Sequence, residues 1–456
     1  MKFINTIKTA FICFGEVNTS IEQLRIMHHE GLNYLEEIGV SVLDCGIVID
    51  DKKYESAHRA IEILKNHSDI PSIVLCIGGW VPSHAIIRVV EGFKNIPMLL
   101  WGLCGWKEEN RIVTTAGQAG TSALRSTLEE MGYKFTYLYN SIGQSYPGSR
   151  VHAFLAACNA VRELCSTRTL SVGYRDMLLY NTQYEAMSVR STFGIEVESM
   201  EMLEMVQNLE HIESREVETL VQYMKTNWTF LKSCDDFLLE TGAKYALALG
   251  EKIQSEQYQA VTINDVDGMK KLLNFPPAIV FMLITQLYGI DTTPENDVMG
   301  NLMQVIMKHL TGKNSHYMEY YEYFDKSLLI GVPDYIPEYA IDGQVQILPA
   351  TFGLLQGSLL NVSKVKTGYV TCTRLAYKKG KFVMHVYTGE AKTPPTWEEF
   401  GWERPAPQLS SLEVFPDSCS VEEFSQKVCS QHVIISYGDY REELKYFCSL
   451  LGIEMI

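Results

Sequence analysis

Two glutamates flank a single predicted helix in the second half of the chain. Glu295 stands in the connection before this helix, which Asp297 is suited to cap and Gly312 to end, because the apolar residues between them recur at helical spacing. Glu319 follows in the aromatic segment 317–324, whose residue types favour a strand. Two carboxylates that meet across such a unit suit a divalent cation such as Mn²⁺. Both acids are therefore candidates for binding one metal ion.

A candidate third ligand is His432, which opens an apolar strand near the end of the chain. An imidazole and two carboxylates hold a divalent cation and leave positions open for substrate oxygens. Residue types alone also allow a structural interpretation, because a histidine beside an apolar strand is often a hydrogen-bonded core residue. Acids near helix starts are likewise common, since they interact favourably with the helix dipole.

A glycine turn near the N-terminus is a candidate ligand contact. Gly78 and Gly79 end a predicted strand, and Trp80 offers a flat face of the kind that packs on sugar rings. Glu16 occupies the matching position after the first predicted strand. A tight turn with a buried tryptophan explains the same residues equally well. The turn lacks the G-x-G-x-x-G pattern, so a nicotinamide-dependent oxidoreductase is only weakly supported.

Composition narrows the class of protein. The 456 residues carry a net charge of -16 and contain no basic run, which argues against a nucleic-acid partner. No apolar run approaches the roughly 20 residues that a membrane span requires. The 11 cysteines include no C-x-x-C pair, so reduced core thiols are expected. These features predict a globular cytoplasmic protein.

The order of predicted elements indicates an α/β protein with three domains. Strands and helices alternate from residue 7 to about 105, which specifies a parallel sheet covered by helices. A second alternation begins after residue 165, and the period changes to two from about residue 344. We therefore expect two doubly wound parallel-sheet domains followed by a β-rich, antiparallel, barrel-like domain. The expected boundaries are 1–166, 167–335 and 336–456.

Three motifs, in the same order, resemble those of the L-arabinose and L-fucose isomerase family, as does the domain order. From Pro294 the chain reads P-E-N-D-V-M-G-N-L-M-Q-V-I-M, which is similar to A-E-G-D-W-x-x-A-x-L-x-R-I-M. From His316 it reads H-Y-M-E-Y-Y-E-Y-F, similar to S-F-M-E-D-Y-T-Y-H. From Gln431 it reads Q-H-V-I-I-S-Y, similar to H-H-T-x-x-S-Y. The resemblance covers essentially the whole chain.

The resemblance implies a metal-dependent aldose–ketose isomerase that acts through an ene-diol. Glu295 and Glu319 would bind Mn²⁺ and move protons, and His432 would be a further ligand. The family also implies a homo-oligomer, a trimer or hexamer, with active sites at subunit interfaces. Trp80 and Glu16 would then contact the sugar, and Arg175 is a further candidate. Arabinose, fucose and sulfoquinovose all remain open as substrates.

The chain also departs from the family pattern. A histidine ligand of G-x-H-M-L-E-x-C-P is missing, because Gly331 is followed by Val332, Pro333 and Asp334. Asp334 is a candidate replacement. The motif tryptophan is Val298, and the motif aspartate after the second glutamate is Tyr320. These changes favour a different sugar, or a non-catalytic sugar-binding or regulatory protein of the same fold.

Overall fold

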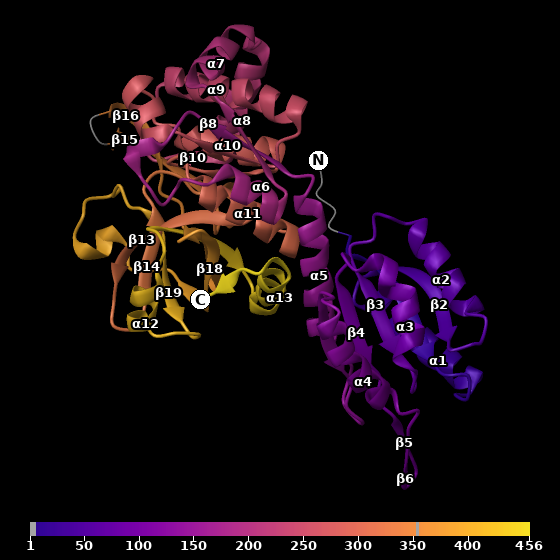
Figure 1. Cartoon of the computed structure of the whole chain (residues 1–456). Coiled ribbons are helices and arrows are strands. Elements are labelled where there is room, and N and C mark those ends of the chain that lie inside the picture. Colours follow the sequence, from indigo (N-terminus) through magenta and orange to yellow (C-terminus); the bar gives the residue numbers. More distant parts are fainter. Residues whose placement is uncertain (1–5, 353–354) are drawn as a thin grey trace. The chain divides into compact units, whose positions relative to one another are not determined.

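The computed structural model describes residues 6–352 and 355–456. Among these, one compact unit comprises residues 6–163 and 442–452, and the other comprises residues 164–441 and 453–456 (Figure 1). No helix in the described ranges is long and apolar enough to cross a membrane.

The first unit is built on a parallel five-stranded sheet, as the alternating pattern predicts. Its strand order is β2-β1-β3-β4-β7, and every neighbouring pair is parallel. The central strands are buried along their whole length, which is why they read as continuous apolar runs. The strands are β1 Lys8–Gly15, β2 Ser41–Ile49, β3 Ile73–Ile77, β4 Met98–Gly102 and β7 Phe135–Tyr139.

Helices and a small hairpin complete this unit. Helix α13 returns to it from the end of the chain, and the Tyr446 ring packs edge-on against Phe154. The helices are α1 Ile21–Glu37, α2 Glu55–Lys65, α3 Ser83–Val90, α4 Gly117–Glu130, α5 Gly148–Leu164 and α13 Arg441–Leu451. The hairpin pairs β5 Trp106–Glu108 with β6 Arg111–Val113.

The second unit contains a parallel four-stranded sheet with the order β12-β11-β8-β9. Its strands are β8 Arg168–Val172, β9 Glu196–Met200, β11 Ala260–Ile263 and β12 Asp291–Thr293. The connected helices are α6 Ala186–Phe193, α7 Met202–Asn208, α8 Ser214–Asn227, α9 Asp236–Glu256, the π-helix Asp265–Leu272, α10 Ala278–Tyr288 and α11 Val298–Thr311. The carboxyl ends of β8, β11 and β12 lie side by side, the place where parallel sheets usually bind ligands.

The same unit contains a closed antiparallel barrel, which agrees with the predicted barrel-like character. The order β17-β20-β13-β14-β19-β18 closes because β18 pairs with β17. Its strands are β13 His316–Tyr323, β14 Leu328–Val332, β17 Gly368–Lys378, β18 Lys381–Lys392, β19 Ser410–Pro416 and β20 His432–Tyr437. Smaller elements are the sheet of β10 Trp228–Phe230, β15 Val345–Phe352 and β16 Leu355–Asn361, helix α12 Val421–Lys427, and β21 Glu454–Met455 beside β18.

Helix α11 joins the parallel sheet to the barrel. It packs against β11 and β12 on one side and against β17 and β20 on the other, so every residue from Val298 to Leu310 is buried. Asp297 caps it and Gly312 ends it in the left-handed conformation, as the sequence predicts. The two candidate glutamates lie at the ends of this unit. Glu295 precedes α11, and Glu319 stands on β13, a strand of the barrel.

Candidate active site

The loop that carries Glu295 is fixed to the carboxyl ends of neighbouring strands. Glu295 and Asn296 have φ of 59° and 43°, a left-handed conformation that non-glycine residues rarely adopt. The Asp265 carboxylate accepts a hydrogen bond from the Glu295 backbone N–H at 2.5 Å. The Asn296 side chain contacts the Ser171 hydroxyl at 2.8 Å and donates to the Tyr174 carbonyl at 2.9 Å. These contacts hold a strained backbone in one arrangement and fix the start of the Glu295 side chain.

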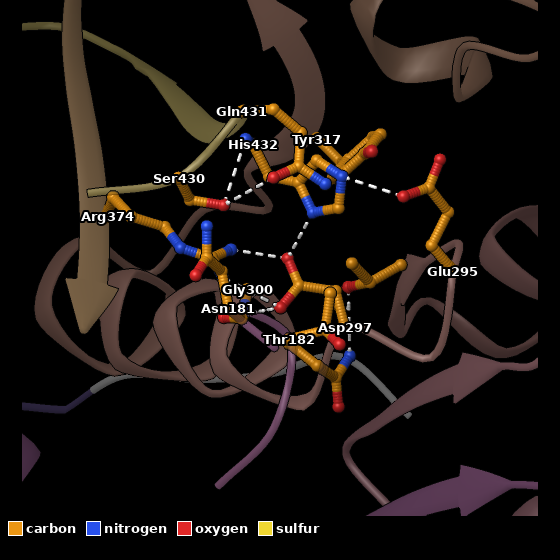
Figure 2. Close-up of polar contacts among 12 residues, drawn as sticks. Asn181, Thr182, Glu295, Asp297, Gly300, Tyr317, Arg374, Ser430, Gln431 and His432 are labelled. Carbon is orange, nitrogen blue, oxygen red and sulfur yellow. Dashed lines mark hydrogen bonds and ion pairs between the residues drawn. The ribbon is translucent and has the colours of Figure 1, made fainter. Parts of the chain in front are cut away.

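Asp297 connects the imidazole of His432 to a guanidinium. His432 Nδ1 lies 2.8 Å from Asp297 Oδ2, and Arg374 forms a two-nitrogen ion pair with the same carboxylate (Figure 2). Asp297 Oδ1 also accepts the Gly300 N–H at 3.0 Å, and Arg374 donates to the Asn181 carbonyl at 2.7 Å. A carboxylate at Nδ1 holds a ring proton there, so Nε2 is the ring nitrogen that remains to contact another group.

Favourable charge interactions among Asp297, His432 and Arg374 offset the cost of burying them. Burial alone would raise the pKa of Asp297, but the Arg374 guanidinium and the hydrogen bond with His432 hold this pKa well below its usual range. Burial alone would lower the pKa of His432, but its contacts with Asp297 and Glu295 raise it to about 9. Three buried polar side chains therefore stabilise one another, and the ring of His432 is fixed in orientation.

The Nε2 atom of His432 faces Glu295. It lies 2.9 Å from Glu295 Oε2, an ion-pair distance, as Figure 2 shows. Nε2 nevertheless makes no hydrogen bond of normal geometry with any described residue. His432 is completely buried, whereas the Glu295 side chain is 15% exposed. A buried ring nitrogen thus faces a carboxylate that reaches solvent.

Glu319 lies beside His432 because β13 and β20 are adjacent. The two residues stand directly opposite each other in the antiparallel ladder, so their side chains share one face. The Tyr317 hydroxyl donates to Glu319 Oε1 at 3.1 Å, and the Tyr317 ring packs against His432 with centroids 4.7 Å apart. Burial, together with the negative charge of Glu295, raises the pKa of Glu319 to about 7. The protonated form of Glu319 is therefore favoured relative to an exposed glutamate.

A second ion-pair network supports the loop. Lys270 of the π-helix lies 3.0 Å from Asp265 Oδ2 and 3.2 Å from Asp334 Oδ2. Burial opposes the charge of Lys270, but Asp334 and Asp265 outweigh it and raise its pKa. Because Asp265 also accepts the Glu295 N–H, the network ties the π-helix, the Glu295 loop and the segment after β14 together. Asp334 as a metal ligand remains a prediction, and here its carboxylate pairs with Lys270.

Glu295, Glu319 and His432 are of the residue types that bind a divalent cation, but they are not arranged as a coordination shell. Within residues 6–352 and 355–456, no group of three or more histidine, cysteine, aspartate or glutamate side chains stands in a geometry that could hold a metal ion. However, the buried Nε2 of His432 lacks a hydrogen bond, and Glu295 and Glu319 flank it. Two carboxylates and an imidazole suit Mn²⁺.

Of the three candidate sugar contacts, only Arg175 belongs to the second unit, which contains Glu295, Glu319 and His432. Trp80 and Glu16 belong to the first unit, where the Trp80 N–H donates to the Thr115 carbonyl at 2.7 Å and its side chain is 38% exposed. Arg175 is in the second unit and follows Tyr174, whose carbonyl contacts Asn296. The Arg175 guanidinium stacks over the Tyr180 ring at 4.8 Å.

Sequence reasoning missed several residues that organise the site. Asp297 was expected to cap α11, which it does, but not to bind His432 as well. Arg374 gave a usable signal, because a charged residue inside the apolar strand V-T-C-T-R-L-A needs a buried partner. Lys270 and Asp265 carried no such signal in the sequence, because they lie on a π-helix, which has no distinctive sequence pattern.

Comparisons with known proteins do not identify the chain. No protein-family model and no curated protein matches it. Solved structures similar to it include a solute-binding protein from Actinobacillus succinogenes 130z with bound D-allose, at 11% identity, 67% of this chain, 93% of that chain and a TM-score of 0.16. Another is a periplasmic sugar-binding protein from Legionella pneumophila, with 12% identity over 67% of this chain and 96% of that chain and a TM-score of 0.17. A third is the periplasmic binding protein of an arabinose transporter from Shewanella sp. ANA-3, with 9% identity over 62% of this chain and 89% of that chain and a TM-score of 0.16. TM-scores this low carry no argument about function.

Proposed function

We propose that this protein is a Mn²⁺-dependent aldose–ketose isomerase of the L-arabinose and L-fucose isomerase type. The observation that supports this proposal most is the buried imidazole of His432. Its Nδ1 is fixed by Asp297, while its Nε2 faces Glu295 and lies beside Glu319. A histidine used only as a core residue would need no second ring nitrogen directed at carboxylates.

Glu295, Glu319 and His432 would hold the cation. A bound divalent ion would polarise the sugar carbonyl and the neighbouring hydroxyl and stabilise negative charge on them. Asp297 fixes the orientation of the His432 ring through Nδ1 and is itself paired with Arg374, the usual task of residues behind a metal-binding histidine, so that Nε2 would hold the cation in place of a proton.

The carboxylates supply the proton transfers that isomerisation needs. One removes a proton from the carbon next to the carbonyl, and the other handles the proton on the neighbouring oxygen. Burial and the negative charge of Glu295 raise the pKa of Glu319, which favours proton uptake by this carboxylate. The Glu295 side chain is 15% exposed and is held in place through its backbone by Asp265. Their different environments suit two different roles.

The alternative is a non-catalytic sugar-binding or regulatory protein. Two features favour it: a family histidine is absent at Pro333, and Asp334, the possible replacement, pairs with Lys270. A binder has no need of a Lewis acid, so Mn²⁺ binding at Glu295 and Glu319 separates the two proposals. The family resemblance also supports a cytoplasmic homo-oligomer, whose size light scattering would measure.

An activity assay tests the proposal. The purified protein is incubated with Mn²⁺ and a panel of aldoses that includes arabinose, fucose and sulfoquinovose, and ketose formation is measured. We expect one aldose to be converted, and Glu295→Gln and Glu319→Gln each to reduce kcat by at least about 100-fold. Glu322→Gln is the matched control, because Glu322 is exposed on the same strand as Glu319. Full activity in either site variant would overturn the proposed roles.

A further inference from the structure

Strand β13 is irregular at Tyr321. Tyr320 pairs with Ile330 and Glu322 pairs with Leu329, so Tyr321 is an extra residue with no partner position on β14. Such a β-bulge bends the strand locally and redirects the side chain, and bulges are frequent beside active sites. This bulge lies two residues after Glu319.

The ring of Tyr321 occupies space that a glycine leaves open. Gly331 stands opposite Glu319 in the ladder, and a Cβ atom at Gly331 would come within 2.8 Å of Tyr321 Cε2. Burial raises the pKa of the Tyr321 hydroxyl, and the nearby charges of Glu319, Asp334 and Glu295 raise it further. The hydroxyl therefore lies near the carboxylates of the candidate site.

The Tyr321 hydroxyl has no hydrogen-bond partner among the residues that the structure describes, although it is buried. Leaving such a group unpaired destabilises the folded protein, so an unpaired buried hydroxyl needs an explanation. Tyr317 on the same strand differs, because its hydroxyl donates to Glu319. The Tyr320 hydroxyl is also buried without a hydrogen-bond partner among the described residues, but its ring packs against Phe424 with centroids 4.9 Å apart.

We propose that Tyr321 is a sugar-contacting residue, whose hydroxyl donates a hydrogen bond to an oxygen of an open-chain polyhydroxy sugar held beside Glu295 and Glu319. The inference rests on the proposed function for its class of substrate. In their ionised form the neighbouring carboxylates only accept hydrogen bonds, so they then bind the hydroxyl protons of a sugar. Tyr321 adds the complementary donor, which a sugar oxygen needs and which the carboxylates do not provide.

Substitution Tyr321→Phe tests this proposal, because it removes the hydroxyl and keeps the ring. Binding of ribitol, arabinitol and galactitol, which mimic open-chain sugars without reacting, is measured by calorimetry in the presence of Mn²⁺. We expect the affinity of the best alditol to fall about tenfold, as for the loss of one hydrogen bond. The thermal midpoint without alditol should be unchanged or higher, since an unpaired buried hydroxyl is removed. Tyr320→Phe, on the same strand, should bind alditols like the wild type.

Equal alditol affinity in Tyr321→Phe and the wild type would overturn the inference. A lower thermal midpoint in Tyr321→Phe would also overturn it, because the hydroxyl would then have a structural partner. So would the absence of alditol binding to the wild-type protein. Isomerase activity is measured separately. If no aldose reacts but alditol affinity depends on Tyr321, the proposed isomerase is contradicted while the sugar contact is supported.

Discussion

His432 Nδ1 and Asp297 Oδ2 lie 2.8 Å apart, although 135 residues separate them in the sequence. Asp297 caps helix α11, and His432 opens strand β20 of the barrel. The contact therefore joins the end of the parallel sheet to the barrel at the candidate site. Arg374, on β17, completes the group from a third element.

The first prediction concerns this buried group. Asp297→Asn removes the charge that compensates Arg374, so we expect a loss of about 3–5 kcal/mol in the free energy of unfolding. Urea denaturation measures this loss. Asp342→Asn is the control, because Asp342 forms an exposed ion pair with Lys364, worth at most about 1 kcal/mol. Equal stability of the two variants would contradict the account of the group.

The second prediction concerns Lys270. Lys270→Met leaves Asp265 and Asp334 buried without their shared cation, so we expect destabilisation by about 3 kcal/mol in urea denaturation. The neighbouring Lys271 also pairs with an aspartate, Asp267, but is largely exposed. Lys271→Met should therefore cost about 1 kcal/mol or less. Similar losses in both variants would show that burial of the Lys270 pair has no special effect.

The third prediction concerns Gly300, in the first turn of α11. A Cβ atom here would lie 2.5 Å from Asp297 Oδ2 and 3.0 Å from Arg374 Nη1, so Gly300→Ala must displace one of them. We expect a loss of about 1–3 kcal/mol in the free energy of unfolding, measured in urea. At Gly92 a Cβ atom meets nothing within 4 Å, so Gly92→Ala should change stability by less than about 0.5 kcal/mol. An unchanged free energy of unfolding in Gly300→Ala would contradict the close packing around Gly300.

Local patterns predicted the elements of the site better than the contacts between them. Helix α11 and strand β13 follow from periodicity and residue type. The burial of Arg374 was not predicted, although its place in an apolar strand is a usable signal. The pairing of His432 with Asp297 does not follow from such patterns, because it depends on how the barrel closes against α11. The bulge at Tyr321 also depends on the register between β13 and β14, which the residue types on one strand do not determine.

The fourth prediction concerns pH. Burial lowers the pKa of His316 to about 3, and neither ring nitrogen has a hydrogen bond among the described residues. In the unfolded chain a histidine binds its proton near pH 6.5. Between these values the unfolded state holds more protons, so stability is complete above about pH 6.5 and falls as pH drops towards 3. The expected slope is about 1.4 kcal/mol per pH unit from this residue.

His316→Phe keeps a ring of similar shape and should make the free energy of unfolding less dependent on pH between 6 and 4. Urea denaturation at several pH values measures the slope. His58 is exposed, so His58→Gln should retain the slope of the wild type. An unchanged slope in His316→Phe would show that this histidine is not held neutral in the folded protein.

A Mn²⁺ titration followed by electron paramagnetic resonance tests the central claim most directly, because bound and free Mn²⁺ give distinct signals. The account predicts one tightly bound ion per chain in the wild type and in Glu322→Gln. Binding should weaken at least about tenfold in Glu319→Gln and in His432→Gln, with circular dichroism verifying that both are folded. A wild-type protein that binds no Mn²⁺, or undiminished binding in both site variants, would contradict a metal site formed by Glu295, Glu319 and His432.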